Sequence, residues 1–280
     1  MPKKDLNILI AVAVVVGCAA VTVHATLVDT YSIYDLQYTT DASGDSPYNG
    51  QIVNCTGGVV MHKHVGGKVR LAIYDKNSPE GWGGIFAATK GPDFDNIQVG
   101  DIVALYNMEV EESRGNTQLF WTSNSSVVPN GTDTLPGPIV VNPSAIAHPK
   151  VAVTEQYEAM YVQVQDVTVT ALDLGKADDD YALTRTGDGV CWATDYYNQE
   201  LHLLDPTATY HPKVSLGNHL DSVSGIIEQY TKTDDQGAII WDYYQLYTLQ
   251  MSDVVPEPAT LGLLLLGGGM LVRRKRKVGA

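Results

Sequence analysis

Short runs of alternating apolar and polar residues, separated by turn-forming residues, dominate the sequence between positions 51 and 248. A period of two residues is typical of half-buried β-strands, and almost no helical periodicity is present. Segment 161–170 is the clearest such run. Gly57-Gly58 predicts a β-bulge, and segment 234–237 predicts a hairpin turn. Evenly spaced short strands predict a sandwich or a barrel. The expected strands are 51–61, 69–75, 83–88, 101–111, 117–122, 161–170, 181–184, 189–195 and 244–248.

A turn-forming stretch divides these strands into two groups. Residues 129–138 carry Pro, Gly and Asn without a run that could form a core strand, and Asn142 could cap a short helical turn. We therefore expect β domains at 26–128 and 150–254, joined by a linker at 129–149. Segment 216–220 echoes 99–103, and 244–248 echoes 117–121, in the same order. Two ordered echoes favour a duplicated domain.

The first 25 residues have the pattern of an export signal. Lys3 and Lys4 precede an apolar run, and small residues end it at Ala25. Cleavage there would leave Thr26 as the new N-terminus. An uncleaved membrane helix is an alternative, because the run is about long enough to span a bilayer. A third reading is lipidation at Cys18, which follows Val15-Val16-Gly17 in a lipobox-like order.

The last 26 residues form a three-part tail. Val255, Pro256, Glu257 and Pro258 precede the apolar stretch 259–272, and a basic run follows it: Arg273, Arg274, Lys275, Arg276 and Lys277. As a helix the stretch would measure roughly 21 Å, short of a hydrocarbon core of about 30 Å. The basic run would remain cytoplasmic. A marginal C-terminal anchor is one interpretation.

This tail also resembles the PEP-CTERM sorting signal of Gram-negative bacteria, over residues 255–280. The resemblance implies that an exosortase recognises the Pro-Glu-Pro motif and cleaves near it. It further implies that a short helix holds the protein transiently in the inner membrane. The mature chain would then reach the cell surface or the extracellular matrix.

A second resemblance concerns the middle of the chain, roughly residues 30–250. The segments 37–40 (Gln-Tyr-Thr-Thr) and 46–50 (Ser-Pro-Tyr-Asn-Gly), and the strand around Gly58, resemble OB-fold modules attached to secreted bacterial nucleases. Segment 155–162 resembles a strand of the same modules, with Ala159 in place of the usual Gly. The resemblance implies an all-β protein with two tandem OB-fold-like five-stranded barrels.

The charge distribution argues against a nucleic-acid ligand. The chain has 18 Lys and Arg against 32 Asp and Glu, and seven of the basic residues lie at its two ends. Residues 26–254 retain 11 basic and 30 acidic residues, a net charge of −19. Phosphate binding usually depends on clustered basic residues. The closest group here is Lys63, Lys68, Arg70 and Lys76, so we expect no binding to nucleic acid.

The sequence offers only weak candidates for a metal site, and no cofactor is expected. His62 and His64 would lie on one face of a strand, but no third ligand can be named. Asp178, Asp179 and Asp180 lack the spacing of an EF-hand loop. Beyond Cys18, only Cys55 and Cys191 remain, which either pair in an oxidising compartment or act as two small buried hydrophobic residues.

No nucleophile elbow, P-loop, zinc-protease motif or dinucleotide fingerprint is present. Aromatic residues on or beside the predicted strands could instead stack on sugar rings: Trp82, Trp121, Trp241, Tyr243 and Tyr244. The leading hypothesis is a non-enzymatic exported protein that binds polysaccharide. The alternatives are a secreted hydrolase of matrix polymers and a nucleic-acid-binding module.

Overall fold

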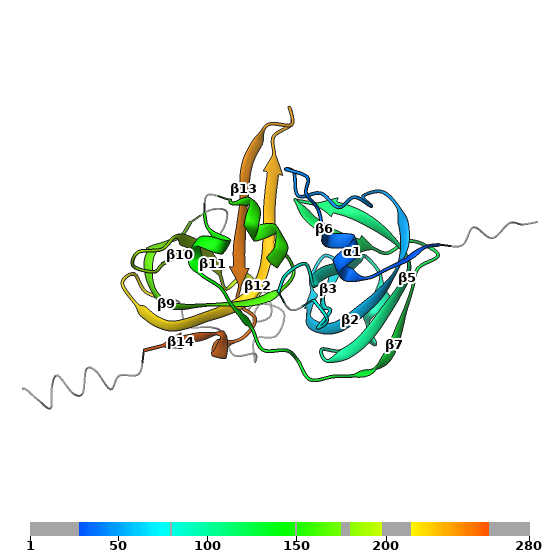
Figure 1. The fold of residues 1–280 in the computed structure, drawn as a ribbon, viewed down its shortest axis with the longest axis horizontal. Helices are drawn as coiled ribbons and strands as arrows, with labels where there is room; N and C mark the ends of the chain where they lie inside the picture. Colours follow the sequence, from blue (N-terminus) through cyan, green and yellow to red (C-terminus); the bar gives the residue numbers. More distant parts are fainter. Residues whose placement is uncertain (1–27, 79, 149, 175–179, 198–213, 258–280) are drawn as a thin grey trace, which may run out of the picture.

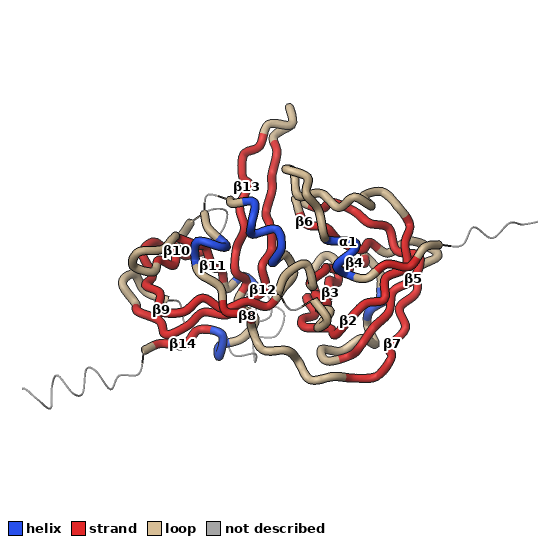
Figure 2. The backbone as a smooth tube through the Cα atoms, in the orientation of Figure 1, coloured by secondary structure: helices blue, strands red, loops and turns tan. Residues whose placement is uncertain are grey.

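The computed structural model describes residues 28–78, 80–148, 150–174, 180–197 and 214–257, and it is mainly β, with 51% of residues in strands and 11% in helical turns. Two seven-stranded sheets lie side by side, one from each half of the sequence (Figure 1). The few helical turns lie at the margins of the strands (Figure 2). The predicted signal 1–25 and the tail beyond Glu257 lie outside the described residues.

The first sheet contains seven strands in the order β1-β2-β3-β4-β6-β5-β7. An additional pairing of β2 with β5 closes a five-strand circuit, β2-β3-β4-β6-β5. Within the circuit only β4 and β6 run parallel. The elements are β1 (Thr30–Tyr31), α1 (Ile33–Gln37), β2 (Ile52–Val65), β3 (Val69–Tyr74), β4 (Gly84–Thr89), η1 (Pro92–Phe94), β5 (Asp101–Ser113), β6 (Asn116–Phe120) and β7 (Ser126–Thr132).

The second sheet repeats this connectivity. Its order is β14-β12-β13-β11-β10-β9-β8, and the pairing of β12 with β9 closes the circuit β9-β10-β11-β13-β12. Here β11 and β13 are the parallel pair. The elements are β8 (Ile139–Val140), η2 (Pro143–Ile146), η3 (Ala152–Tyr157), β9 (Tyr161–Leu172), β10 (Asp180–Thr184), β11 (Val190–Thr194), β12 (His219–Thr233), β13 (Ile239–Tyr247), η4 (Met251–Asp253) and β14 (Val254–Pro256).

The two sequence echoes occupy matching places in the two circuits. The amide of Gly100 donates to the carbonyl of Val60, and the amide of Gly217 donates to the carbonyl of Val169, each at 2.8 Å. Both glycines have positive φ and lie one or two residues before a long strand. In the parallel pairs, Leu119 lies opposite Ala87, just as Leu246 lies opposite Ala193. The shared connectivity supports the predicted duplication.

Local chemistry explains several of these elements. Helix α1 begins with a capping box, in which the side chains of Ser32 and Asp35 each accept a hydrogen bond from the other's backbone amide. The register of β2 against β5 shifts near Gly57, as predicted for a bulge. A Cβ at Gly57 would lie 1.7 Å from the carbonyl oxygen of Val103, so only glycine fits there. The predicted turn after Thr233 is also present, closed by a hydrogen bond from Asp234 to Ala238.

The segment predicted as a linker, 129–149, contains regular structure. Strand β7 extends to Thr132 along the outer edge of β5, and β8 pairs parallel with β9. Helix η2 forms where a capped turn was expected and buries Ile146 in the second core. Most residues of β7 are exposed, so the strand is held by backbone pairing and has no alternating apolar pattern for sequence analysis to detect.

The second hydrophobic core crosses between the halves. It joins residues of β9 to β13 with Met61, Ala72, Tyr74 and Phe86 of the first half, whereas the first core is built only from first-half residues. Cys55 lies in the first core and Cys191 in the second, and both are free thiols. They therefore act as small buried hydrophobic residues. No helix in the described part of the chain has the length and apolar character needed to cross a membrane.

Candidate binding cleft

A cleft of about 350 Å³ lies between the two halves. One wall comes from the turn between β2 and β3 and from the β5–β6 hairpin, and the other comes from β10 to β13 and the residues after β11. Because both halves contribute, the cleft depends on how they pack together. Its lining residues are His64, Gly67, Lys68, Arg70, Ser113, Arg114, Gln118, Asp180, Thr194, Tyr196, Tyr197, Glu228, Tyr230, Tyr243, Gln245 and Tyr247.

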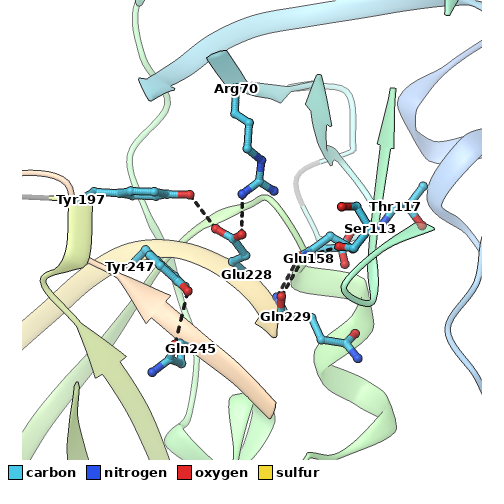
Figure 3. Close-up of polar contacts among 10 residues, drawn as sticks. Arg70, Ser113, Thr117, Glu158, Tyr197, Glu228, Gln229, Gln245 and Tyr247 are labelled. Carbon is cyan, nitrogen blue, oxygen red and sulfur yellow. Dashed lines mark hydrogen bonds and ion pairs between the residues drawn. The ribbon is translucent and has the colours of Figure 1, made fainter. Parts of the chain in front are cut away.

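An ion pair across the halves forms part of the cleft wall (Figure 3). The guanidinium of Arg70 contacts Glu228 Oε1, while the hydroxyl of Tyr197 donates to Glu228 Oε2 at 2.6 Å. The guanidinium also lies 4.2 Å from the ring centre of Phe86. Burial alone would lower the pKa of Arg70, but Glu228 raises it above its ordinary value. Arg70 is therefore charged and is held in place by its ion pair with Glu228.

Tyrosines and histidines form the aromatic part of the cleft. The ring of Tyr197 lies 4.9 Å from that of His62, 4.7 Å from that of His64 and 4.9 Å from that of Tyr247. Burial lowers the pKa of His62 to about 3, so this imidazole is neutral and packs as an aromatic ring. Across the cleft, the guanidinium of Arg114 lies 5.4 Å from the ring centre of Tyr230. The result is a concave surface rich in flat rings.

Two nitrogen atoms of cleft-lining residues, Arg70 Nε and Gln245 Nε2, have no hydrogen-bond partner. Gln245 is 4% exposed, its Oε1 accepts a hydrogen bond from Tyr247 at 3.3 Å, and its Nε2 has no hydrogen-bond partner. A buried amide donor without a partner costs free energy in an empty site. Gln245 therefore carries an unused donor within the wall of the cleft.

Beside the cleft, a second set of polar contacts joins the halves. The side-chain amide of Asn116 donates to the carbonyl of Gln229 at 2.6 Å and accepts from its amide at 2.8 Å. Glu158 Oε1 accepts from the amide of Thr117 at 2.9 Å and from the side chain of Gln37 at 3.2 Å. These bonds replace solvent for buried polar groups and fix the orientation of the two halves.

Three carboxyl groups gather at this junction. Burial raises the pKa of Glu112 and raises that of Glu155 to about 7. The pKa of Glu158 is raised well above its ordinary value. The larger cause is burial, and the second is repulsion from the neighbouring carboxylates of Glu155 and Glu112. The hydroxyl of Tyr244 donates to Glu155 Oε2. A partly protonated acidic group therefore lies where the halves meet.

The aromatics predicted to face a ligand are dispersed, and only Tyr243 lines the cleft. Trp82 packs on Tyr38, Trp121 packs on Phe94, and Trp241 packs on Tyr243. Tyr243 and Tyr244 are 2% and 1% exposed, so their rings belong mainly to the core. Their strand is buried on both faces near its end, and alternation therefore did not separate inward from outward rings.

The two groups of residues considered as metal ligands in the sequence are used differently in the structure. His62 and His64 both pack on Tyr197, and Asp180 lies in β10 at the cleft, whereas Asp178 and Asp179 lie outside the described residues. Among the residues that the structure describes, no group of three or more His, Cys, Asp or Glu side chains could hold a metal ion.

The predicted basic group is likewise not a free patch. Lys63 donates to three backbone carbonyls at the end of η1, and Lys76 pairs with Asp133. Lys68 lies 5.0 Å from the ring centre of Phe120, and Arg70 pairs with Glu228. Each of these cations is thus used within the fold.

Sequence reasoning missed most of the cleft. Tyr196, Tyr197, Tyr230 and Tyr247 line it, as do Arg70 and Gln245. The adjacent tyrosines after the 189–195 strand were the one local signal, since two large aromatics at a strand end commonly mark a surface. Their role becomes visible only when the halves are packed together.

Comparisons with known proteins identify the sorting motif at the C-terminal end of the chain. Residues 254–277 match the PEP-CTERM protein-sorting motif. No curated protein gives a significant match to the chain. Among solved structures, the OB domain of Ta0387 from Thermoplasma acidophilum is 17% identical, with 40% of this chain and 92% of that chain covered and a TM-score of 0.25. Fission yeast Pot1 with ssDNA is 16% identical, with 70% of this chain and 79% of that chain covered and a TM-score of 0.28. A murine DNA-binding protein with ds DNA is 10% identical, with 70% of this chain and 95% of that chain covered and a TM-score of 0.33.

Proposed function

We propose that this chain is an exported surface protein of a Gram-negative bacterium that is sorted by an exosortase. The match of residues 254–277 to the sorting motif supports export, processing and transient anchoring by the C-terminal segment. The signal-like residues 1–25 would direct the chain across the inner membrane first. After cleavage near Pro256, the β-rich part would be delivered to the cell surface or the extracellular matrix.

Deletion of the exosortase in the native host tests the sorting step. The wild-type chain should then accumulate in the inner-membrane fraction with its tail attached, while cells that keep the enzyme release a shorter form. A Glu257→Ala variant should accumulate like the deletion. Equal surface delivery with and without the enzyme would contradict the proposal.

We further propose that each closed strand circuit is an OB-fold-like barrel and that the cleft between them binds polysaccharide without cleaving it. The observation that carries this proposal is the tyrosine-rich cleft with the unpartnered amide of Gln245. Flat rings suit sugar faces, and polar groups that converge in a cavity of this size are typical of ligand sites. Glu228 is held by Arg70 and Tyr197, which leaves it poorly suited to act as a base.

Binding of a panel of surface and matrix polysaccharides to the exported protein tests this proposal. Tyr230→Ala should weaken binding of any hit about tenfold, because a stacking ring is lost. Tyr106→Ala is the matched control, since Tyr106 is an exposed tyrosine outside the cleft. Appearance of shortened saccharides would favour the hydrolase alternative, and salt-sensitive binding of a single-stranded oligonucleotide would favour the nucleic-acid alternative.

A further inference from the structure

The start of the sorting motif is part of the folded second half. Strand β14 (Val254–Pro256) pairs antiparallel with β12, with Val254 opposite Val223 and Val255 opposite Ser222. Pro256 lies opposite Leu220 at the edge of the sheet, where the missing N–H of proline is tolerated. The first three residues of the matched segment 254–277 are thus an edge strand.

The glutamate of the Pro-Glu-Pro motif is also held. Glu257 Oε1 lies 3.1 Å from His219 Nδ1, and Asp166 Oδ1 lies 3.2 Å from His219 Nε2. The backbone amide of Glu257 donates to the carbonyl of His219 at 3.5 Å. His219 therefore lies between the two carboxylates, with one ring nitrogen facing each of them.

The chain is anchored immediately before this strand. Asp253 is 2% exposed and accepts hydrogen bonds from the hydroxyl of Tyr161 at 2.6 Å and from the amides of Leu249 and Gln250 at 2.7 and 3.0 Å. Val254 packs against the second core. The motif therefore leaves the fold from a fixed point.

We propose that the folded second half docks residues 254–257 of the motif through β12, His219 and Asp166, and that β14 must separate from β12 before an exosortase can cleave. This inference rests on the proposed exosortase processing. The backbone of this segment pairs with β12 and the Glu257 carboxylate contacts His219, so a peptidase that binds either of them must first displace these contacts. Only three residues are paired, so local opening is much easier than unfolding of the second half. The docked strand slows processing until it opens.

Pulse–chase measurement of processing in cells that contain the exosortase tests the dependence on opening. His219→Ala should raise the rate about two- to fivefold, the effect of losing one exposed ion pair. Lys232→Ala is the matched control, because Lys232 is an exposed β12 residue that lies opposite Trp241 of β13, at the other end of the strand from β14. The double variant Ser222→Cys with Val255→Cys places two cysteines at paired positions of β12 and β14, where a disulfide would lock the strands together. Its processing should be at least about tenfold slower under oxidising conditions and should recover on reduction.

Millisecond hydrogen exchange on the full-length chain in detergent gives a readout that does not involve the enzyme. The amide of Glu257 should be protected in the wild-type chain and lose protection in His219→Ala. An unprotected amide in the wild-type chain would overturn the docking. Equal processing of the wild-type, His219→Ala and disulfide-locked chains would also overturn it. A wild-type chain that the exosortase leaves uncut would instead contradict the proposed function, and docking would then be decided by the exchange result.

Discussion

Arg70 both joins the two halves, through its ion pair with Glu228, and lines the cleft. We predict that Arg70→Gln destabilises the protein by about 3 kcal/mol, since Glu228 would remain buried without its cation. Its side chain and that of Glu228 are only 17% and 13% exposed. Urea unfolding followed by tyrosine and tryptophan fluorescence measures the change.

Lys76→Gln is the control for this prediction. Lys76 pairs with Asp133, but its side chain is 62% exposed, so the pair should contribute less than about 1 kcal/mol. Equal destabilisation by the two variants would show that the Arg70 pair has no special role at the interface.

Because the pKa of Glu155 is shifted in the fold, we expect the free energy of unfolding to depend on pH. Its pKa is raised to about 7 in the fold, so the fold favours the protonated form. The resulting stability is fully present below the ordinary value of 4.5 and is lost as pH rises through 7. We predict that unfolding free energy falls by roughly 1–3 kcal/mol between pH 5 and pH 8. Glu155→Gln should make this fall shallower without abolishing it, because the raised pKa values of Glu112 and Glu158 act in the same direction. A wild-type stability that rises over this interval would contradict the prediction.

At the scale of elements, alternation and turn residues predict every strand of the first closed circuit and four of the five strands of the second. The fifth, β12 (His219–Thr233), was not among the expected strands, although the echo at 216–220 lies at its start. All five strands expected in the first half are present, with ends shifted by a few residues. The edge strands β1, β7 and β8 were not predicted, because they are short or exposed and are held by backbone pairing to β2, β5 and β9. Hydrophobic pattern carries no information about such pairing.

Strand β4 meets the second half at Gly84. A Cβ there would lie 2.5 Å from the carbonyl oxygen of Glu158 and from the carbonyl carbon of Ala159. We predict that Gly84→Ala destabilises the protein by about 1–3 kcal/mol, because backbone from the other half cannot move aside locally. Gly137→Ala, in open space, should be close to neutral in the same thermal or urea titration. A neutral Gly84→Ala would indicate that the halves separate readily.

For the whole molecule, the sequence predicts two β domains joined by a linker, and the interface between the halves decides whether they unfold separately. Met61, Ala72, Tyr74 and Phe86 pack into the second core from the first half. We predict a single unfolding transition for residues 26–254 and a lower urea midpoint for the isolated segment 150–254. Two separate transitions, with fragment 150–254 matching one of them, would instead support independent domains.

The same interface explains why the candidate site could not be predicted. The C-terminal motif is local in sequence and needs no fold to be recognised, so Val255, Pro256 and Glu257 were identified directly. The cleft brings Arg70 to Glu228, 158 positions apart, through a packing arrangement that no local pattern encodes. Aromatic content indicated the kind of ligand surface, and only the fold shows which rings form it.

The most direct test of the account is the mass of the mature protein recovered from the cell surface or the medium. Mass spectrometry should show a chain that begins at Thr26 and ends between Pro256 and Pro258, as the proposed export and sorting of this chain require. Recovery of surface protein that still carries Arg273 to Lys277 would contradict processing at the sorting motif and, with it, the central claim.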